Sequence, residues 1–508
     1  MLCNMEKSRR NRCDVLFLSV LSGKIHMECE LMRNLSLLMD YYELTMAYSY
    51  FLEKKHEQIA VFDVFFRDIP DSGGYALFAG LEQVIEYIRD FKITEEEVKF
   101  LKSKKTFSSD FIEYLKNIKL NLTVYSVKEG TPVFPNEPIM IVKGPLLHCQ
   151  LVETFILLTI NHQSLIATKT SRIVREAKGR AVMEFGARRA QGYDAANYGA
   201  RAAFIAGAIG TSNAYADMLF DINALGTMAH SYVQSFKTEY EAFLAYAKSY
   251  PSATLLLVDT YNTLKQGIPN AIRVYNEYLK PLGQELKGIR IDSGDLAYLT
   301  IEARKLLDKA GLKNTKITVS NSLDEYSIRT LIEQGAQIDT FGVGERLITS
   351  KSDPVFGGVF KLAALEESGA LVPKIKISDN VQKMTTPGFK QIYRMFDNEN
   401  KAIADVVTFH DELVDEKKPY TLFDPIHPWK SKEITNFRAV KILETIIKDG
   451  KLIYKKPTLN AIREYCQDQM NTLWKEMLRL DVPHQYYVDL SKPLWEKKQE
   501  LINEHVAK

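Results

Sequence analysis

The sequence is poor in cysteine and tryptophan, and neither sign of charge is in excess. Its five cysteines include no C-x-x-C pair, which argues against a structural metal, and we expect a reducing, cytoplasmic compartment. The net charge of +2 gives no reason to expect nucleic acid or an anionic membrane as a partner. No apolar run approaches the roughly 18 uncharged residues of a membrane span. These absences leave an ordinary soluble globular protein, for which 46% hydrophobic residues are typical.

The chain of 508 residues is longer than one hydrophobic core usually organises, and its character changes along its length. Residues 1–31 combine a basic start with a short apolar run, and we predict a disordered or non-native extension there. Residues 32–160 predict an α+β domain. Residues 391–508 predict strands and then an amphipathic helix at 458–480, in a segment that packs back on the N-terminal domain.

Between these regions, residues 161–390 alternate short apolar runs with helical patterns. The runs cover residues 181–185, 224–229, 254–258, 288–291, 316–319 and 339–343. Their regular recurrence is typical of repeated βα units. We therefore predict an α/β fold with a (β/α) barrel, which can be irregular or incomplete, beside an α+β domain formed by the N-terminal part and the C-terminal segment.

Polar residues and glycines stand at or just beyond the ends of these six runs. They are Arg188 and Arg189, His230 and Ser231, Asp259, Asp292, Ser320 and Asn321, and Gly342 and Gly344. In a barrel the ends of the strands share one face, so these residues should converge. Arginines and glycine turns bind phosphate, carboxylates bind a sugar diol or hydrated Mg²⁺, and histidine acts as base, nucleophile or ligand. Any one of them alone is more often structural, but together they indicate a barrel enzyme acting on a sugar phosphate.

Several longer motifs occur in order along the chain. They are E-F-G-A-R-R-A-Q-G, G-T-S-N, G-T-M-A-H-S-Y, L-V-D-T-Y-N, R-I-D-S-G-D-L, S-N-S-L-D-E and F-G-V-G-E, preceded by D-Y-Y-E-L-T-M at residues 40–46. From about residue 32 to the C-terminus, the chain resembles the nicotinate phosphoribosyltransferases, within the type II phosphoribosyltransferases. The resemblance implies transfer from 5-phosphoribosyl-1-pyrophosphate to nicotinate, with nicotinate mononucleotide and pyrophosphate as products for NAD biosynthesis. It also implies Mg²⁺ and a coupled hydrolysis of ATP.

The resemblance assigns roles to individual residues. His230 would carry the phosphoryl group of a phosphohistidine, and Asp259 would orient its ring. Arg290 and Asp292 would complete the catalytic set, with Asp259 and Asp292 near Mg²⁺. The remaining substrate-binding residues would be Tyr42, Phe185, Arg188, Arg189, Ser212, Ser231, Ser320, Asn321, Gly342 and Gly344. Phe185 and Tyr42 would sandwich the pyridine ring, with Tyr42 donated by the second subunit of a homodimer.

Other functions stay open at this point. A nicotinamide-using relative would carry an acidic residue near the Gly-Thr step, where this chain has the neutral Ser212, and Arg189 adds positive charge that favours a carboxylate substrate. A decarboxylating quinolinate relative would lack the phosphohistidine. A barrel aldolase or isomerase would usually need a lysine or a paired acid and base at a strand end. A non-catalytic scaffold would not need His230, Asp259 and Arg290 intact.

Overall fold

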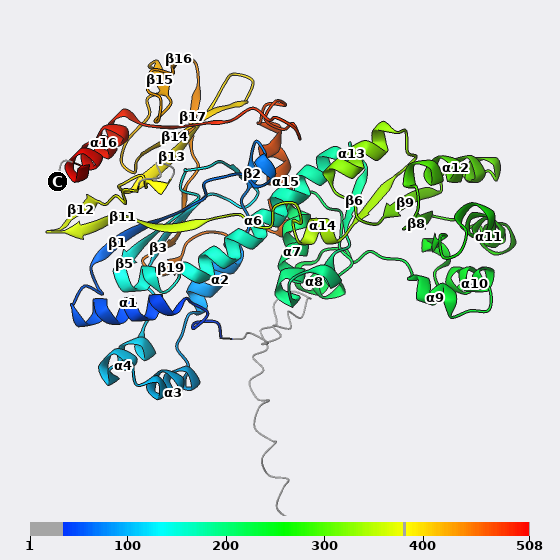
Figure 1. Ribbon diagram of the computed structural model, residues 1–508, viewed down its shortest axis with the longest axis horizontal. Coiled ribbons are helices and arrows are strands. Elements are labelled where there is room, and N and C mark those ends of the chain that lie inside the picture. Colours follow the sequence, from blue (N-terminus) through cyan, green and yellow to red (C-terminus); the bar gives the residue numbers. More distant parts are fainter. Residues whose placement is uncertain (1–33, 379–382, 507–508) are drawn as a thin grey trace, which may run out of the picture.

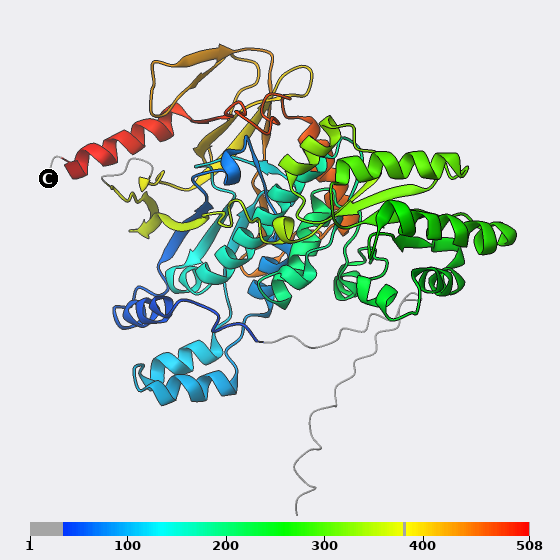
Figure 2. The same ribbon diagram turned by 45° about the vertical axis from the view of Figure 1, so that its right-hand side comes forward.

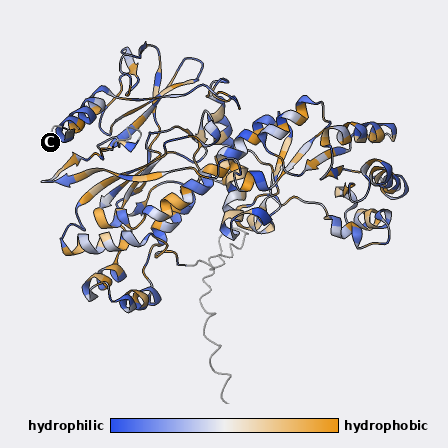
Figure 3. Cartoon of the chain, viewed as in Figure 1, coloured by the Kyte–Doolittle hydropathy of each residue, from blue (hydrophilic) through white to orange (hydrophobic). Residues whose placement is uncertain are grey.

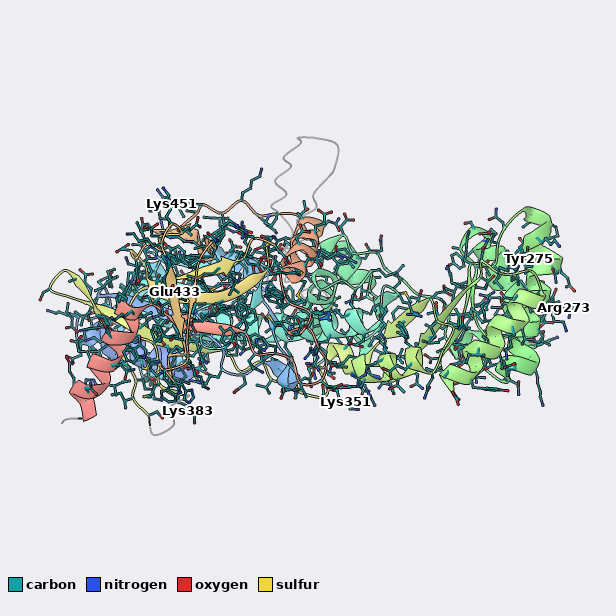
Figure 4. All side chains as sticks on the ribbon, turned by 90° about the horizontal axis from the view of Figure 1, so that it is seen from above. Arg273, Tyr275, Lys351, Lys383, Glu433 and Lys451 are labelled. Atoms are coloured by element: carbon teal, nitrogen blue, oxygen red, sulfur yellow. The ribbon has the colours of Figure 1, made fainter. Side chains whose placement is uncertain are left out.

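The computed structural model describes residues 34–378 and 383–506, and the extension predicted at 1–31 lies outside them. The described residues form an elongated molecule with two masses (Figure 1). Antiparallel sheets make up one mass, and a parallel sheet with its helices makes up the other. Seen from above, Arg273 and Tyr275 mark the far end of the parallel part, while Glu433 and Lys383 lie in the antiparallel part (Figure 4).

Five parallel strands form the sheet that the βα pattern predicts. In spatial order they are β6 (Ala181–Glu184), β10 (Thr340–Val343), β9 (Lys316–Ser320), β8 (Gly288–Ile291) and β7 (Leu255–Leu257). Each is a short apolar run buried on both faces, as strands of parallel sheets are. Five of the six predicted strands are therefore confirmed, with bounds within one residue of those expected.

The prediction of a sixth strand at residues 224–229 is wrong. Single parallel bridges join Glu184 to Thr211 and Thr211 to Ala224, and they extend the sheet beyond β6 without making a regular strand. After Leu225 the segment leaves the sheet, at Gly226, a residue that weakens strands. Within residues 34–378 and 383–506 the sheet stays open, because β7 pairs with β8 alone.

The other mass is built on a seven-stranded antiparallel sheet. Its order is β12 (Ala370–Pro373), β11 (Val359–Glu367), β1 (Ile59–Phe65), β5 (Met140–Pro145), β3 (Thr123–Ser126), β18 (Glu444–Lys448) and β19 (Lys451–Leu452). β11 pairs with β1, about 300 residues away in sequence, although it falls in the stretch expected to belong to the barrel. The C-terminal strand β18 joins the same sheet beside β3, so N- and C-terminal segments share it.

Smaller sheets complete the strand content. A four-stranded sheet has the order β17 (Arg438–Lys441), β13 (Lys390–Phe396), β14 (Ala402–Phe409) and β20 (Tyr487–Leu490), and two pairs join β15 (Tyr420–Phe423) to β16 (Ser431–Ile434) and β2 (Ala76–Leu77) to β4 (Pro132–Val133). The helix expected at 458–480 is α15, Leu459–Asn471, which ends early. Beyond it the chain turns, so that Leu473 and Met477 are buried without a helix.

Helices cover both masses. They are α1 (Tyr41–Leu52), α2 (Leu81–Asp90), α3 (Glu95–Lys104), α4 (Ser109–Asn117), α5 (Leu146–Gln150), α6 (Glu153–Glu176), α7 (Tyr193–Ile205), α8 (Ala214–Phe220), α9 (His230–Gln234), α10 (Glu239–Ser249), α11 (Ile268–Val274), α12 (Leu296–Lys309), α13 (Glu325–Glu333), α14 (Glu345–Ile348) and α16 (Lys492–Val506). In Figure 3 they carry both hydrophobic and hydrophilic stretches, as helices that bury one face do. No described helix is long and apolar enough to cross a membrane.

Motif residues also begin helices. Asn213 of G-T-S-N caps α8 by accepting hydrogen bonds from the backbone N–H groups of Tyr215 and Ala216. Asp295 of D-S-G-D caps α12 through the N–H of Tyr298. One residue of each motif therefore caps a helix, and this cap fixes the loop that precedes the helix.

Candidate active site

The carboxyl ends of the parallel strands carry most of the residues that the sequence singles out. Phe185 follows β6, Asp259 and Thr260 follow β7, and Asp292 follows β8. Because parallel strands present these ends along one edge of the sheet, their loops form one surface. The backbone of the sheet determines this placement, and contacts between the side chains determine which of these residues form one site.

His230 is the first residue of α9 and is 38% exposed at its side chain. Its Nε2 lies 3.9 Å from Asp259 Oδ1 and 3.9 Å from Asp292 Oδ2, while its Nδ1 lies 3.1 Å from Thr260 Oγ1. Two carboxylates beside Nε2 favour the tautomer that keeps a proton there. The lone pair of Nδ1 then accepts a hydrogen bond from the Thr260 hydroxyl.

Asp259 is almost completely buried, with 2% of its side chain exposed. Its Oδ2 accepts two hydrogen bonds, from the backbone N–H of Asp292 at 2.8 Å and from Ser293 Oγ at 2.6 Å. Its Oδ1 is buried and has no hydrogen-bond partner in the described part of the chain. A buried acceptor left unpaired is costly, so this oxygen is poised for a donor that approaches from His230.

Arg290 connects the histidine to the aromatic part of the site. Its Nε donates to Ser320 Oγ at 2.8 Å and its Nη2 to Asp292 Oδ1 at 2.9 Å, and the Ser320 hydroxyl also donates to Asp292. The guanidinium carbon lies 5.5 Å from the centre of the Phe185 ring. Arg290, Asp292, Ser320 and Phe185 therefore form a continuous cluster that runs from β8 through β9 to the end of β6.

The Phe185 ring is half-buried and packs over β10. A Cβ atom added at Gly342 would stand 2.6 Å from Cδ2 of this ring, which is closer than side chains approach. The Phe185 backbone N–H also donates to Val343 at 2.7 Å. The absence of a side chain at Gly342 thus lets the ring pack closely against the backbone of β10.

Glu184, a carboxylate at the end of β6, supports the Phe185 loop. Glu184 is fully buried, accepts a hydrogen bond from Thr211 Oγ1 at 2.6 Å and another from the N–H of Gly186, and burial raises its pKa. The Ser212 N–H donates to the Glu184 carbonyl at 2.8 Å. Glu184 therefore ties the loop of Arg188 to that of Ser212. The G-T-S-N motif contained this signal, but only the fold brings its threonine to Glu184.

The remaining predicted residues lie around this cluster. Arg188 and Arg189 lie in a short helical turn after Phe185, and both are exposed. Ser212 and Asn321, in loops, and Ser231, in α9, are exposed as well. Asn321 has φ 103°, a left-handed backbone conformation that bends the chain sharply after β9. Gly344 precedes α14 and approaches the Phe185 carbonyl. These side chains face solvent at the edge of the sheet, where a ligand can reach them.

Tyr42 lies elsewhere in the molecule. It belongs to α1, beneath the antiparallel sheet and at the opposite end from β8 (Figures 1 and 2). It is 44% exposed at the mouth of a cavity of about 540 Å³ whose lining residues include Tyr50, Glu153, Phe360 and Lys361. Partial burial, and then the neighbouring Glu153 carboxylate, raise the pKa of the Tyr42 phenol. Within one chain, Tyr42 therefore does not join Phe185.

The carboxylates at the edge of the parallel sheet are few. In the ranges that the structure describes, no group of three or more histidine, cysteine, aspartate or glutamate side chains is arranged to hold a metal ion. Asp259 and Asp292 are the carboxylates that lie beside His230. Mg²⁺ commonly takes one or two carboxylates and completes its shell with phosphate oxygens and water, so this pair fits an ion that arrives with a phosphorylated ligand.

A parallel sheet with a histidine, two carboxylates, arginines and glycines along one edge defines an α/β enzyme that acts on phosphorylated ligands. Three family models match consecutive parts of the chain: the nicotinate phosphoribosyltransferase N-terminal domain at residues 37–161, the nicotinate phosphoribosyltransferase family at 180–402 and the C-terminal domain at 389–498. The chain therefore belongs to the nicotinate phosphoribosyltransferase family, as its motifs predict.

Individual relatives agree over nearly the whole chain. The chain is 45% identical to nicotinate phosphoribosyltransferase of Bacillus subtilis (strain 168), over 93% of this chain and 96% of that protein. It is 35% identical to nicotinate phosphoribosyltransferase of Dictyostelium discoideum, over 91% of this chain and 87% of that protein. The crystal structure of human nicotinic acid phosphoribosyltransferase is similar with a TM-score of 0.81 at 28% identity, covering 92% of this chain and all of that chain.

Proposed function

We propose that this protein is a nicotinate phosphoribosyltransferase that joins nicotinate to the ribose of 5-phosphoribosyl-1-pyrophosphate. The products are nicotinate mononucleotide, a precursor of NAD, and pyrophosphate, and the reaction is coupled to hydrolysis of ATP through His230. The observation that carries the proposal is the cluster of His230, Asp259, Asp292 and Arg290 beside Phe185. It combines a nucleophilic imidazole, a flat aromatic surface and a cation for a charged substrate.

The transfer step exchanges one bond at the anomeric carbon. The pyridine nitrogen of nicotinate attacks this carbon, the carbon–oxygen bond to pyrophosphate breaks, and pyrophosphate leaves with the electron pair. The transition state resembles an oxocarbenium ion, so negative charge near the ribose stabilises it, and Asp292 is suited to that position. The nitrogen is already a nucleophile, so catalysis rests on positioning: Phe185 holds one face of the ring, and Arg290 meets the substrate carboxylate or a phosphate.

The coupling step uses the other end of the cluster. The Nδ1 lone pair of His230 attacks the γ-phosphorus of ATP, the bond from this phosphorus to the bridging oxygen breaks, and ADP leaves with the electron pair. The ring keeps its proton on Nε2 and gains positive charge, which faces Asp259 and Asp292 at 3.9 Å. The Thr260 hydroxyl, now beside Nδ1, is placed to turn toward a phosphoryl oxygen.

Asp259 and Asp292 would hold Mg²⁺ that enters with ATP or with the pyrophosphate group. When bound, the ion supplies positive charge beside phosphate oxygens. The exposed Arg188 and Arg189 on one side, and Ser320, Asn321, Gly342 and Gly344 on the other, would bind the remaining phosphates.

A steady-state assay of nicotinate against nicotinamide, with and without ATP, tests the proposed reaction. We expect preference for nicotinate, because Ser212 is neutral and Arg188 and Arg189 add positive charge near the ring. His230→Ala should abolish the stimulation by ATP and leave a slower basal transfer. Preference for nicotinamide would overturn the substrate assignment, and ATP stimulation that survives in His230→Ala would overturn the phosphohistidine.

We also propose a homodimer in which Tyr42 of one subunit covers the ring that Phe185 of the other supports. The exposed side chains Leu38, Tyr41, Tyr42 and Leu52 on and before α1 support this, since such an apolar set favours burial against another chain. Mixed dimers of Tyr42→Ala and Arg290→Ala test the idea. A shared site puts both defects in one site and leaves the other intact, so mixing two weakly active variants should restore activity. Failure to recover activity in proven mixed dimers would place Tyr42 outside the site.

We propose that the open parallel sheet is an incomplete barrel. The bridges at Thr211 and Ala224 support this, because they extend the sheet beyond β6 toward His230. We place the domain boundaries at 32–160, 161–390 and 391–508, with β11 and β12 assigned to the antiparallel part because β11 pairs with β1. A cytoplasmic location suits the two buried free thiols, Cys149 and Cys466.

A further inference from the structure

The carboxylate of Asp259 is held from one side. Both of its hydrogen bonds go to Oδ2, from Ser293 Oγ at 2.6 Å and from the Asp292 N–H at 2.8 Å. Oδ1, which faces His230 Nε2 at 3.9 Å, has no donor among the residues that the structure describes. One oxygen of the carboxylate is therefore held by the protein, and the other is free to accept a hydrogen bond.

This division depends on the rotation of the carboxylate. The terminal torsion of an aspartate has a broad, roughly twofold preference, so an unrestrained carboxylate turns easily. Two donors that meet at Oδ2 fix the plane of the group and hence the direction of Oδ1. One donor is the backbone of Asp292, which the strand β8 positions. The other is the hydroxyl of Ser293, an exposed residue of the loop that follows.

We propose that Ser293 is a positioning residue that holds Asp259 so that Oδ1 accepts a hydrogen bond from the Nε2–H group of His230 during phosphoryl transfer. This inference rests on the proposed function, since it concerns how His230 becomes a nucleophile. When Nδ1 is phosphorylated, the ring becomes positive and its Nε2–H needs an acceptor. Hydrogen bonds at active sites often shorten from the resting state to the reacting state, and a preset Oδ1 makes that approach short.

The test is the substitution Ser293→Ala in the full-length protein. Loss of a hydrogen bond to a carboxylate should lower the ATP-coupled kcat about 10- to 100-fold. The basal transfer without ATP and the KM for nicotinate should change much less than the coupled rate, because the Ser293 hydroxyl bonds to Asp259 and not to the Phe185 side of the site. Ser293 is exposed, so the thermal midpoint should not change. Ser293→Thr keeps the hydroxyl and should restore most of the coupled rate.

Ser235→Ala is the matched control. Ser235 is an exposed serine at the end of α9, and its hydroxyl bonds to the Tyr232 carbonyl, away from Asp259. It should keep the coupled rate of the unsubstituted protein. An equal loss in Ser235→Ala would show that any serine near His230 matters, and the specific role of Ser293 would be rejected.

A readout that does not depend on turnover separates this inference from the proposed function. ¹⁵N NMR of histidine-labelled protein reports which ring nitrogen of His230 carries the proton, with the His230→Ala spectrum giving the assignment. We expect Nε2–H in the unsubstituted protein and a mixture of tautomers in Ser293→Ala. Unchanged ring signals together with an unchanged coupled rate would overturn the positioning role. A protein that forms no phosphohistidine but shows the tautomer change would instead contradict the proposed coupling.

Discussion

Two clusters of charged side chains show opposite arrangements. Arg201 of α7 is fully buried, and its Nη1 and Nη2 bond to both oxygens of Glu129 at 2.8 and 2.7 Å and to Glu82 at 2.7 Å. At the edge of the parallel sheet, His230 is 38% exposed, and the buried Oδ1 of Asp259 has no partner in the described chain. In the first cluster both terminal nitrogens of the guanidinium are hydrogen-bonded to carboxylates. In the second, the Asp259 oxygen lacks a donor and the His230 ring is accessible to a ligand.

The difference separates charge that holds the fold from charge that performs chemistry. Arg201 joins α7 to Glu129, in the loop between β3 and β4, and to Glu82 of α2, so it fastens the parallel part to the antiparallel part. The His230 cluster joins only strand ends, loops and the start of α9 at one edge of one sheet. A buried charge is stable when opposite charges bind it, as Glu129 and Glu82 bind Arg201, although the Arg201 Nε has no hydrogen-bond partner in the described chain. A catalytic group needs an atom that is free to meet the substrate. Substitutions in the two clusters should therefore affect different measurements.

The largest effect is expected for Asp259→Asn. The amide would turn an N–H group toward the Nε2–H of His230, so two donors would face each other and the required tautomer would be lost. We expect the ATP-coupled rate to fall on the order of 10²- to 10⁴-fold, with the thermal midpoint retained. The control is Asp308→Asn, an exposed carboxylate paired with Arg304 on α12. A coupled rate within a few-fold of normal in Asp259→Asn would contradict the role of the carboxylate.

Arg201→Met should act on stability. Removing one partner of a buried ion cluster leaves carboxylates without compensation, and we expect the free energy of unfolding to fall by about 3–5 kcal/mol. Urea titration measures this change. Arg329→Met breaks the exposed pair with Asp481 and should change the stability far less. Equal losses in the two variants would mean that the buried cluster has no special role.

His162 is a third kind of titratable group: its ring is half-buried, and its Nε2 has no hydrogen-bond partner in the described part of the chain. Burial lowers the pKa of His162, on α6, from 6.5 to about 4. Between these values the unfolded chain binds the extra proton and the folded chain does not, so stability is full above pH 6.5 and is lost as the pH falls toward 4. The loss amounts to at most about 3 kcal/mol.

His162→Leu removes this titration. Urea titrations at pH 4.5 and pH 7 should show a smaller drop in stability for the variant than for the unsubstituted protein. The comparison is made within each protein, so any packing change common to both pH values cancels. The same pH dependence in both proteins would show that His162 titrates normally in the folded state.

The smallest effect is expected for Gly342→Ala. The new Cβ would stand 2.6 Å from the Phe185 ring, and overpacking of this kind costs about 1–3 kcal/mol. Displacing the ring should raise the KM for nicotinate, so the KM is the quantity to measure. Gly226→Ala is the control, because a Cβ there meets no atom within 4 Å. Equal KM values in the two variants would show that Phe185 does not contact the ring.

The parallel strands were the most predictable part of the fold. β8 occupies residues 288–291 as expected, because a short apolar run ends there at a charged tip. The strand expected at 224–229 failed because periodicity does not reveal that the chain leaves the sheet after Leu225. The pairing of β11 with β1 could not be predicted either, since the two strands are far apart in sequence and each is apolar in its own right.

The site divides in the same way. Asp259, Arg290, Asp292 and Ser320 follow or end strands, so the order of the motifs was enough to bring them to one edge. Thr260, Ser293 and Glu184 act through side-chain hydrogen bonds between loops, and these depend on torsions that no sequence pattern specifies. The assignment of Tyr42 to a second subunit came from the family resemblance and stays a prediction.

His230 is proposed to accept a phosphoryl group because its ring is exposed and the Asp259 Oδ1 beside it has no hydrogen-bond partner in the described chain. The most direct measurement is mass spectrometry of the intact protein and its peptides after incubation with ATP and Mg²⁺, under conditions that preserve phosphohistidine. We predict one phosphoryl group, located on His230, that disappears when nicotinate and 5-phosphoribosyl-1-pyrophosphate are added. ATP-stimulated transfer with no phosphoryl group on His230, or with the group on another residue, would contradict the account.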